Sequence, residues 1–185
     1  MQTEVMFAGF GGQGIMLIGQ MLAYAGMNEG KNVVWLPSYG PEMRGGTAYC
    51  TVVVADRAIG SPIIDHPTTI AVLNRPSLEK FESKVKTDGL LLINTSLIDI
   101  RSDREDIQKV HIAANEIAME CGTGKAANMA VLGAYVGFTK AVQMESLEPL
   151  VHKQFAKKPQ FIDVNLEVLK RGWALGDEAS RQAHN

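Results

Sequence analysis

The chain has 185 residues, of which 46% are hydrophobic and 21% charged, with a formal net charge of -2. This composition is typical of a folded globular domain and excludes a disordered chain. The near-neutral charge excludes a broad basic surface for nucleic acid or an anionic membrane, so any anion must be held locally. No apolar run approaches the roughly 18 residues of a membrane-spanning helix, and no basic leader is present, which predicts a cytoplasmic protein.

The first predicted elements form a strand, a glycine turn and a helix. Residues 5–10 are a continuous apolar run that ends in glycines, which predicts a buried central strand. The many apolar side chains of residues 13–28 predict a largely buried helix that ends at Gly30. Residues 32–36 predict a second strand, which completes a βαβ unit with a right-handed crossover.

A loop and a hairpin are predicted next. Residues 37–46 contain three glycines and two prolines, which rules out regular structure. The β-branched run at 47–56 predicts a third strand, and a turn at 56–60 is expected to pair it with residues 59–64.

The rest of the chain is predicted to alternate strands and helices. The expected elements are strands at 69–73, 90–94 and 109–112, and helices at 76–86, 115–121, 128–142, 146–155 and 163–173. Ser146 is expected to cap its helix, and a polar C-terminal tail is expected from about residue 174. Gly133 and Gly137 predict that the helix they share presses closely against its neighbours.

This order of elements predicts the fold class α/β. We expect one domain over residues 1–185, with a doubly wound, mostly parallel sheet, mixed at the hairpin, and helices on both faces. Ligands of such sheets bind beyond the carboxyl ends of the strands. The loops after Phe10, Leu36 and Ile93 all lie at such ends.

Residues 9–14 match the pattern G-x-G-x-x-G between a predicted strand and a predicted helix. Glycines allow close approach to a ligand, and the amides and dipole of the helix start favour a phosphate. The alternative is a turn that serves only helix packing. A dinucleotide is disfavoured, because no acidic residue stands at the end of the second strand to bind the ribose, and no P-loop motif is present.

The loop at 38–46 displays functional side chains on a scaffold of glycine and proline. Arg44 is suited to a phosphate or carboxylate, and Tyr39 can stack or donate a hydrogen bond. The alternative is a surface loop with an ion pair between Glu42 and Arg44, which contributes little.

The cysteines and histidines give no candidate metal ligand or catalytic residue. Cys50 and Cys121 are far apart and form no C-x-x-C motif, so we expect two reduced thiols without a disulfide, zinc or iron–sulfur site. The four histidines show no metal spacing and no paired nucleophile.

Three segments in order closely resemble the gamma subunit of 2-oxoacid:ferredoxin oxidoreductases. They read Phe-Gly-Gly-Gln-Gly at 10–14, Ser-Tyr-Gly-Pro-Glu-Met-Arg-Gly-Gly at 38–46, and Lys-Ala-Ala-Asn-Met-Ala-Val-Leu-Gly at 125–133. The resemblance extends from residue 5 to about residue 170. It implies a subunit, inactive alone, of an enzyme that decarboxylates a 2-oxoacid, forms the acyl-CoA thioester and reduces ferredoxin. It favours 2-oxoglutarate as the substrate, with pyruvate, branched-chain and indolepyruvate enzymes still open.

The resemblance also implies a division of labour. Thiamine diphosphate, magnesium and iron–sulfur clusters would be held by partner chains, expected to be alpha, beta and delta subunits, while this chain helps to bind coenzyme A. The candidate contact residues are Gly11, Gly12, Gln13, Gly14, Tyr39, Arg44, Gly45, Lys125 and Asn128.

Several alternatives stay open at this point. Lys125 and Asn128 also fit an ordinary helix start, and the polar residues at 94–96 also fit a closed turn. At the level of function, the alternatives are a stand-alone dinucleotide-binding oxidoreductase and an assembly or regulatory module without a ligand.

Overall fold

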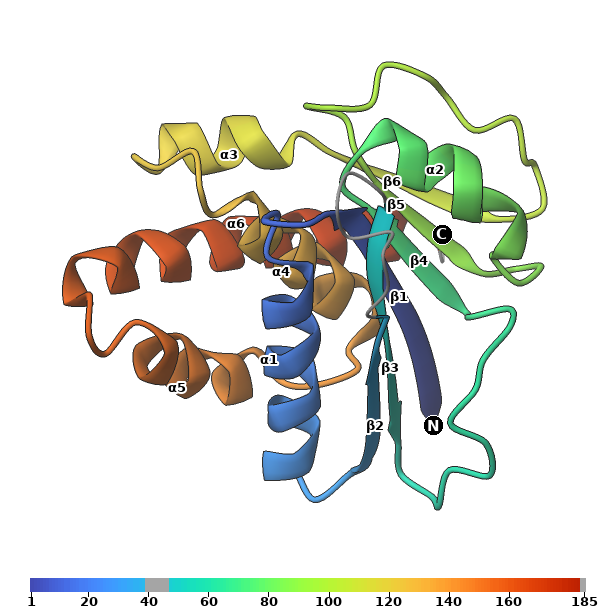
Figure 1. Ribbon diagram of the computed structural model, residues 1–185, viewed down its shortest axis with the longest axis horizontal. Coiled ribbons are helices and arrows are strands. Elements are labelled where there is room, and N and C mark those ends of the chain that lie inside the picture. Colours follow the sequence, from blue (N-terminus) through green and yellow to red (C-terminus); the bar gives the residue numbers. More distant parts are fainter. Residues whose placement is uncertain (39–46, 184–185) are drawn as a thin grey trace.

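The computed structural model describes residues 1–38 and 47–183 (Figure 1). The described strands form one six-stranded sheet in the order β2-β3-β1-β4-β5-β6. The strands are β1 (Gln2–Phe10), β2 (Asn32–Pro37), β3 (Thr47–Ala55), β4 (Thr69–Val72), β5 (Leu90–Asn94) and β6 (Gln108–Ile112). The α-helices are α1 (Ile15–Asn28), α2 (Arg75–Phe81), α3 (Ala114–Glu120), α4 (Ala127–Thr139), α5 (Met144–Gln154) and α6 (Ile162–Ala183). Short 3-10 turns lie at Glu82–Lys84 and Pro159–Phe161.

The sheet is mixed because β3 runs antiparallel to both of its neighbours, β1 and β2. Strands β1, β4, β5 and β6 are parallel to one another. The predicted class, a doubly wound mixed sheet with helices on both faces, is confirmed (Figure 1).

The predicted hairpin between the third strand and residues 59–64 is wrong. Residues 59–64 contain no strand, and β3 is hydrogen-bonded to β1 along one edge and to β2 along the other. The predicted βαβ unit also differs from a simple one, because β3 lies between its two parallel strands, β1 and β2. A strand that inserts between two others leaves no free edge for a hairpin partner, and local sequence does not reveal such an insertion.

The core has two layers, one on each face of the sheet. Alternate residues of β1 point to opposite faces, so Val5 and Phe7 join the larger cluster while Met6 and Ala8 join the smaller one. The larger cluster packs α1, α3, α4, α5 and α6 against the sheet, and the smaller one packs α2 there. Figure 1 shows α1, α4, α5 and α6 on one side of the sheet and α2 on the other.

Helices α4 and α6 pack with their backbones in near contact, as the glycines of α4 predicted. A Cβ atom at Gly133 or Gly137 would overlap a backbone carbonyl oxygen of α6, and one at Gly172 or Gly176 would overlap a carbonyl oxygen of α4. Glycines on both helices therefore fit into each other's surface, and the pair forms a rigid wall behind the sheet.

Several helix boundaries differ from the sequence predictions. Helix α6 continues through Ala183, well past residue 173, because its second half still packs on α4 and carries an i,i+4 ion pair between Asp177 and Arg181. Helix α5 has Gln143 as its N-cap, so Ser146 is not the cap. No helix among the described residues is both long and apolar enough to cross a membrane.

Glu29 ties the end of α1 to the start of α5. Its carboxylate accepts a hydrogen bond from the Gln143 amide (2.6 Å) and pairs with Lys31 (3.0 Å), whose ammonium also donates to the Ala141 carbonyl (2.6 Å). Burial acts to raise the pKa of Glu29, but the hydrogen bonds from Ser146, Gln143 and Lys31 together hold it below its ordinary value. The folded state therefore favours the ionised carboxylate.

Replacing Glu29 by glutamine is expected to lower the free energy of unfolding by about 1–2 kcal/mol at neutral pH, since it removes a charged helix-capping group. Because folding lowers the pKa, this contribution is complete above the unfolded pKa of about 4.3 and is lost as the pH falls through the folded value. Urea titrations at several pH values measure it, with Glu105→Gln as an exposed control. An equal loss at neutral and strongly acidic pH would contradict the role of the charge.

Candidate functional site

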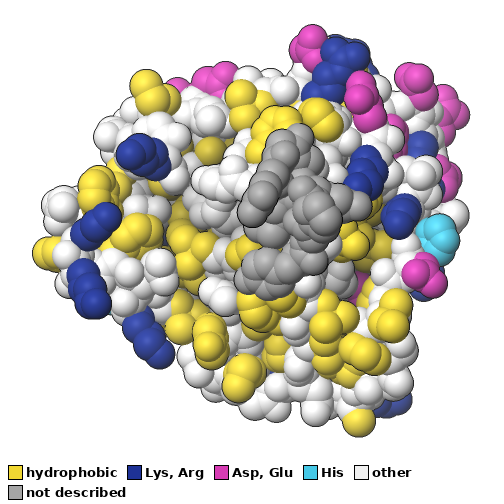
Figure 2. Space-filling model, viewed as in Figure 1, with side chains coloured by type: hydrophobic (Ala, Val, Ile, Leu, Met, Phe, Trp, Pro, Cys, Tyr) yellow, Lys and Arg dark blue, Asp and Glu magenta, His cyan; other side chains and the backbone are white. Residues whose placement is uncertain are grey.

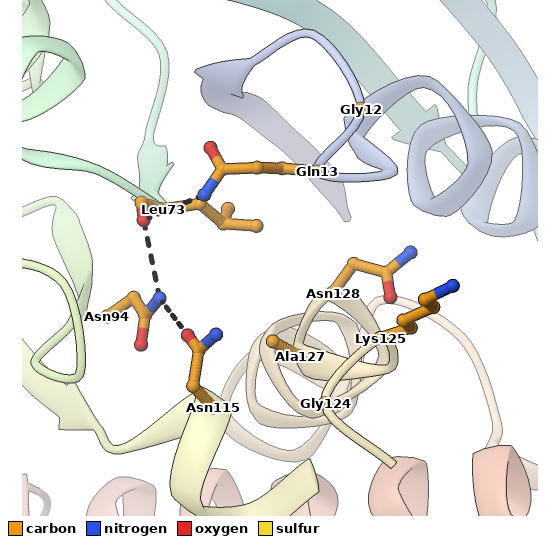
Figure 3. A pocket seen from close by; sticks show the side chains of 9 residues that line it. All are labelled: Gly12, Gln13, Leu73, Asn94, Asn115, Gly124, Lys125, Ala127 and Asn128. Carbon is orange, nitrogen blue, oxygen red and sulfur yellow. Dashed lines mark hydrogen bonds between the residues drawn. The ribbon is translucent and has the colours of Figure 1, made fainter. Parts of the chain in front are cut away.

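A cavity of about 430 Å³ opens at the carboxyl ends of β1, β4 and β5, where the fold class predicts a ligand. Its wall combines the glycine turn after β1 with the starts of α3 and α4 (Figure 3). The lining residues are Gly12, Gln13, Leu73, Asn94, Asn115, Gly124, Lys125, Ala127 and Asn128.

The glycine turn places an uncapped helix start at this cavity. Gly12 and Gly14 have φ angles of 92° and 74°, in the left-handed region that glycine adopts without strain. Gly14 is the N-cap of α1, and no side chain caps the helix there. The first amides of α1 therefore keep their capacity to donate, and the helix dipole adds positive potential. Such a helix start is suited to a phosphate or carboxylate.

Three of the four glycines at residues 9–14 serve different purposes. A Cβ atom at Gly9 would lie 2.5 Å from Ile15 Cδ1, and one at Gly14 would overlap the side chain of Asn128. These two positions need glycine for packing. A Cβ atom at Gly12 would meet nothing within 4 Å, so packing does not explain this glycine. A purely structural turn thus accounts for Gly9 and Gly14 by packing and for Gly12 by its left-handed φ, and the open space beside Gly12 leaves room for a ligand.

Gln13 holds the turn in place. Its Oε1 accepts hydrogen bonds from the Phe10 amide (2.6 Å) and from Asn74 Nδ2 (3.0 Å), and its Nε2 donates to the Leu73 carbonyl (3.4 Å). The side chain thus bridges the end of β1 and the end of β4. Its polar groups are engaged within the chain, which assigns Gln13 to shaping the cavity.

The start of α4 faces the glycine turn across the cavity. Its N-cap, Ala126, offers no side-chain hydrogen bond, and the first turn holds no acidic residue. Asn128 is 6% exposed and donates to the Gly14 carbonyl (3.3 Å), so it joins the two helix starts. Lys125, an exposed residue one step before this N-cap, lines the same cavity. The structure thus brings Gly12, Lys125 and Asn128 together at one cavity, and their contact with a ligand stays a prediction.

Two asparagines on the opposite wall complete the cavity. Asn94 accepts from the Ala114 amide (3.2 Å) and donates to the Leu73 carbonyl (3.3 Å) and to Asn115 Oδ1 (3.0 Å), as Figure 3 shows in part. Its Oδ1 therefore caps α3 and also accepts from the Ser96 amide (3.3 Å), which closes the turn after β5. This agrees with the alternative that residues 94–96 serve to close a turn. The sequence patterns did not mark Leu73 or Asn115 as site residues. For Asn115 there was one indication, because it closely follows the carboxyl end of a predicted strand.

The charge of the cavity wall favours an anion. Lys125 carries the only formal charge among the described lining residues, and none of them is Asp or Glu. Two helix starts without side-chain caps add their dipoles to this ammonium. The described wall therefore combines several donors with positive potential.

Some predicted site residues lie elsewhere. Gly11 is exposed in the turn but does not line the described cavity wall. Tyr39, Arg44 and Gly45 lie outside the described residues, so their part in the site stays a prediction.

The thiols and possible metal ligands stand apart from the cavity. Cys50 is fully buried, and burial raises the pKa of its thiol to about 12, which keeps it protonated. Cys121 is partly buried and free. Among the described residues, no group of three or more His, Cys, Asp or Glu side chains is arranged to hold a metal ion.

A doubly wound mixed sheet with an uncapped helix start at its carboxyl edge defines an α/β domain of the kind whose ligands bind at that edge. The chain belongs to the pyruvate ferredoxin/flavodoxin oxidoreductase family, whose sequence profile matches residues 4–175. The predicted resemblance to gamma-type subunits is confirmed by the relatives and structures that follow.

Two relatives differ in how much of their own length the chain covers. The chain is 41% identical over 177 residues to the ketoisovalerate oxidoreductase subunit VorA of Methanothermobacter marburgensis. The aligned region covers 94% of this chain and 37% of VorA. It is 31% identical over 181 residues to the 2-oxoglutarate synthase subunit KorC of Methanocaldococcus jannaschii, and the aligned region covers 96% of this chain and 96% of KorC. The chain thus spans about a third of VorA and nearly all of KorC.

Two solved structures share the fold. The gamma subunit of a keto/oxoacid ferredoxin oxidoreductase from Geobacter sulfurreducens has a TM-score of 0.83 and 27% identity, covering 95% of this chain and 99% of that one. A 2-oxoglutarate:ferredoxin oxidoreductase from Magnetococcus marinus, with 2-oxoglutarate, coenzyme A and succinyl-CoA bound, has a TM-score of 0.86 and 24% identity. That match covers 96% of this chain and 31% of the other, and it supports the fold alone.

Proposed function

We propose that the chain is the gamma subunit of a 2-oxoacid:ferredoxin oxidoreductase and holds the phosphate portion of coenzyme A. The observation that carries this proposal is the cavity at the carboxyl edge of the sheet, where two uncapped helix starts and Lys125 meet without any carboxylate among the described lining residues. In it, the amides of Gly12, Gly14 and Ile15 donate to the diphosphate, while the Gln13 amide donates to the Phe10 carbonyl (3.2 Å).

The chemistry of coenzyme A fits this cavity better than that of a neutral substrate. The molecule carries several phosphate charges, and charged acceptors gain most from backbone donors and a nearby ammonium. A volume of about 430 Å³ falls within the usual range for small-molecule sites and holds one part of so long a ligand. The Magnetococcus marinus enzyme, 31% of whose chain shares this fold, has coenzyme A bound in its structure.

The other steps of the reaction belong to partner chains in this proposal. Alpha, beta and delta subunits carry thiamine diphosphate, magnesium and iron–sulfur clusters, and they pass electrons to ferredoxin. The present chain binds and orients coenzyme A, and Tyr39, Arg44 and Gly45 add contacts from the loop after β2. Purified alone, it is expected to show no turnover, whereas the assembled complex turns over.

In this proposal, the 2-oxoacid that is used as the substrate is determined by the assembled complex. The sequence resemblance favoured 2-oxoglutarate, but VorA is named for ketoisovalerate and KorC for 2-oxoglutarate. Assays of the complex with 2-oxoglutarate, pyruvate and ketoisovalerate will identify the substrate.

Replacing Lys125 by alanine is expected to weaken coenzyme A binding by the complex about five- to thirtyfold, because a charged hydrogen bond to phosphate is lost. The effect should shrink as salt concentration rises, since the ammonium is exposed. Isothermal titration of the complex measures it.

A matched control is Lys86→Ala, which removes an exposed lysine beside a different cavity, one that reaches the amino end of β5. Equal coenzyme A affinities of the native and Lys125→Ala complexes would remove this side chain from the site. A titration with NADH tests the dinucleotide alternative, and tight binding would favour it.

A further inference from the structure

A second, smaller cavity adjoins the first one. It has a volume of about 220 Å³ and lies between the α3–α4 connection and the segment that joins α5 to α6. Its lining residues are Thr123, Lys125, Phe155, Lys158, Phe161 and Asn165. Lys125 lines both cavities, so a ligand long enough to pass this side chain can occupy the two at once.

The wall of the second cavity offers aromatic surface. Phe155 is partly buried, and Phe161 is 38% exposed. A cavity of about 150 Å³ accommodates benzene, so one of 220 Å³ is large enough to admit much of a flat two-ring base. Aromatic side chains in such a place stack on nucleic acid bases.

Asn165 supplies a directional polar group. It is 6% exposed, and its Nδ2 donates to the Phe161 carbonyl at 2.7 Å. Because a carbonyl can only accept, this bond fixes which end of the amide is nitrogen. The Oδ1 atom has no partner among the described residues and is an acceptor for a ring amine, such as the 6-amino group of adenine.

The charged side chains at this cavity are both basic. Lys125 and Lys158 are exposed lining residues, and no described lining residue is acidic. Lysines also occupy the neighbouring surface at positions 153 and 157. In Figure 2 the charged side chains along the left edge, over α5 and the beginning of α6, are Lys or Arg.

We propose that the cavity between Phe155, Phe161 and Asn165 binds the adenine base of coenzyme A, with Lys158 beside its ribose phosphate. This inference rests on the proposed function and extends it: the glycine turn holds the diphosphate, Lys125 lies between the two cavities, and the base stacks on Phe161. The adenine base and the diphosphate of the ligand are thus held by different parts of the chain.

The test is isothermal titration of the complex with three probes: coenzyme A, adenosine 3′,5′-bisphosphate and 4′-phosphopantetheine. Phe161→Ala is expected to weaken binding of the first two about tenfold to a hundredfold, because a stacking partner is lost. It is expected to leave 4′-phosphopantetheine unchanged. Phe161→Tyr keeps the ring and should retain native affinity for all three probes.

Ile63→Ala is the control, since it shortens an exposed apolar side chain at another cavity, beside β2 and β3. Thermal unfolding of each variant complex separates loss of binding from loss of fold. Unchanged coenzyme A affinity in Phe161→Ala, or an equal loss for 4′-phosphopantetheine, would overturn the adenine site while leaving the glycine-turn proposal intact. Absence of coenzyme A binding by the native complex would instead refute the proposed function.

Discussion

Replacing Gly133 by valine should lower the free energy of unfolding by about 3–5 kcal/mol, a large share of the stability of a typical domain. The new side chain would overlap the Leu169 carbonyl oxygen of α6, and a Cβ atom would already lie 2.8 Å from the Trp173 amide. Because these are backbone atoms, no rotamer change relieves the overlap, and the two helices must separate. Differential scanning calorimetry should show a melting temperature lower by roughly 6–20 °C.

The control for this substitution is Gly60→Val, at a position where a Cβ atom meets nothing within 4 Å and φ is not positive. It is expected to shift the melting temperature by very little. Equal melting temperatures for Gly133→Val and the native chain would mean that α4 and α6 do not pack at the distance described.

Replacing Gly12 by valine should weaken coenzyme A binding by the complex at least a hundredfold, because it changes the backbone conformation of the turn and so moves the amides that bind phosphate. The left-handed φ of 92° suits glycine, and a branched side chain there strains the turn by about 1–3 kcal/mol and projects beside the cavity. Two or more amide bonds to phosphate would then be misplaced, each with a typical contribution of about 1.5–3 kcal/mol. Isothermal titration and steady-state assays with varied coenzyme A measure the loss.

Gly30→Val is the matched control for Gly12→Val. Gly30 also has a left-handed φ, of 74°, and a Cβ atom there meets nothing within 4 Å, but it lies at the other end of α1. Both variants should therefore lose similar stability, while only Gly12→Val loses affinity. Full activity of the Gly12→Val complex at low coenzyme A concentration would refute the phosphate-binding turn.

The sequence predicted the elements that depend on local patterns. The apolar run before the glycine turn, the buried helix after it and the β-branched strand β3 all formed as expected. The errors concern long-range packing. Residues 59–64 did not pair with β3 because β1 and β2 already flank it. Helix α6 continues into the segment predicted as a polar tail because Gly172 and Gly176 fit against α4.

The candidate site was predictable in part for the same reason. Glycine spacing marked Gly12, and the family resemblance marked Lys125 and Asn128; the three residues lie together at the cavity. The roles of Gln13 and Asn94 were not readable, since each depends on a carbonyl at the end of β4 that only the folded sheet brings near. The second cavity joins segments about thirty to forty residues apart, and no motif in the sequence marks it.

The most direct measurement is a structure of the assembled complex with coenzyme A bound. We expect the diphosphate within hydrogen-bond distance of the amides of Gly12, Gly14 and Ile15, with Lys125 beside it. Coenzyme A bound to a partner chain, or on this chain but away from the carboxyl ends of β1 and β4, would contradict it.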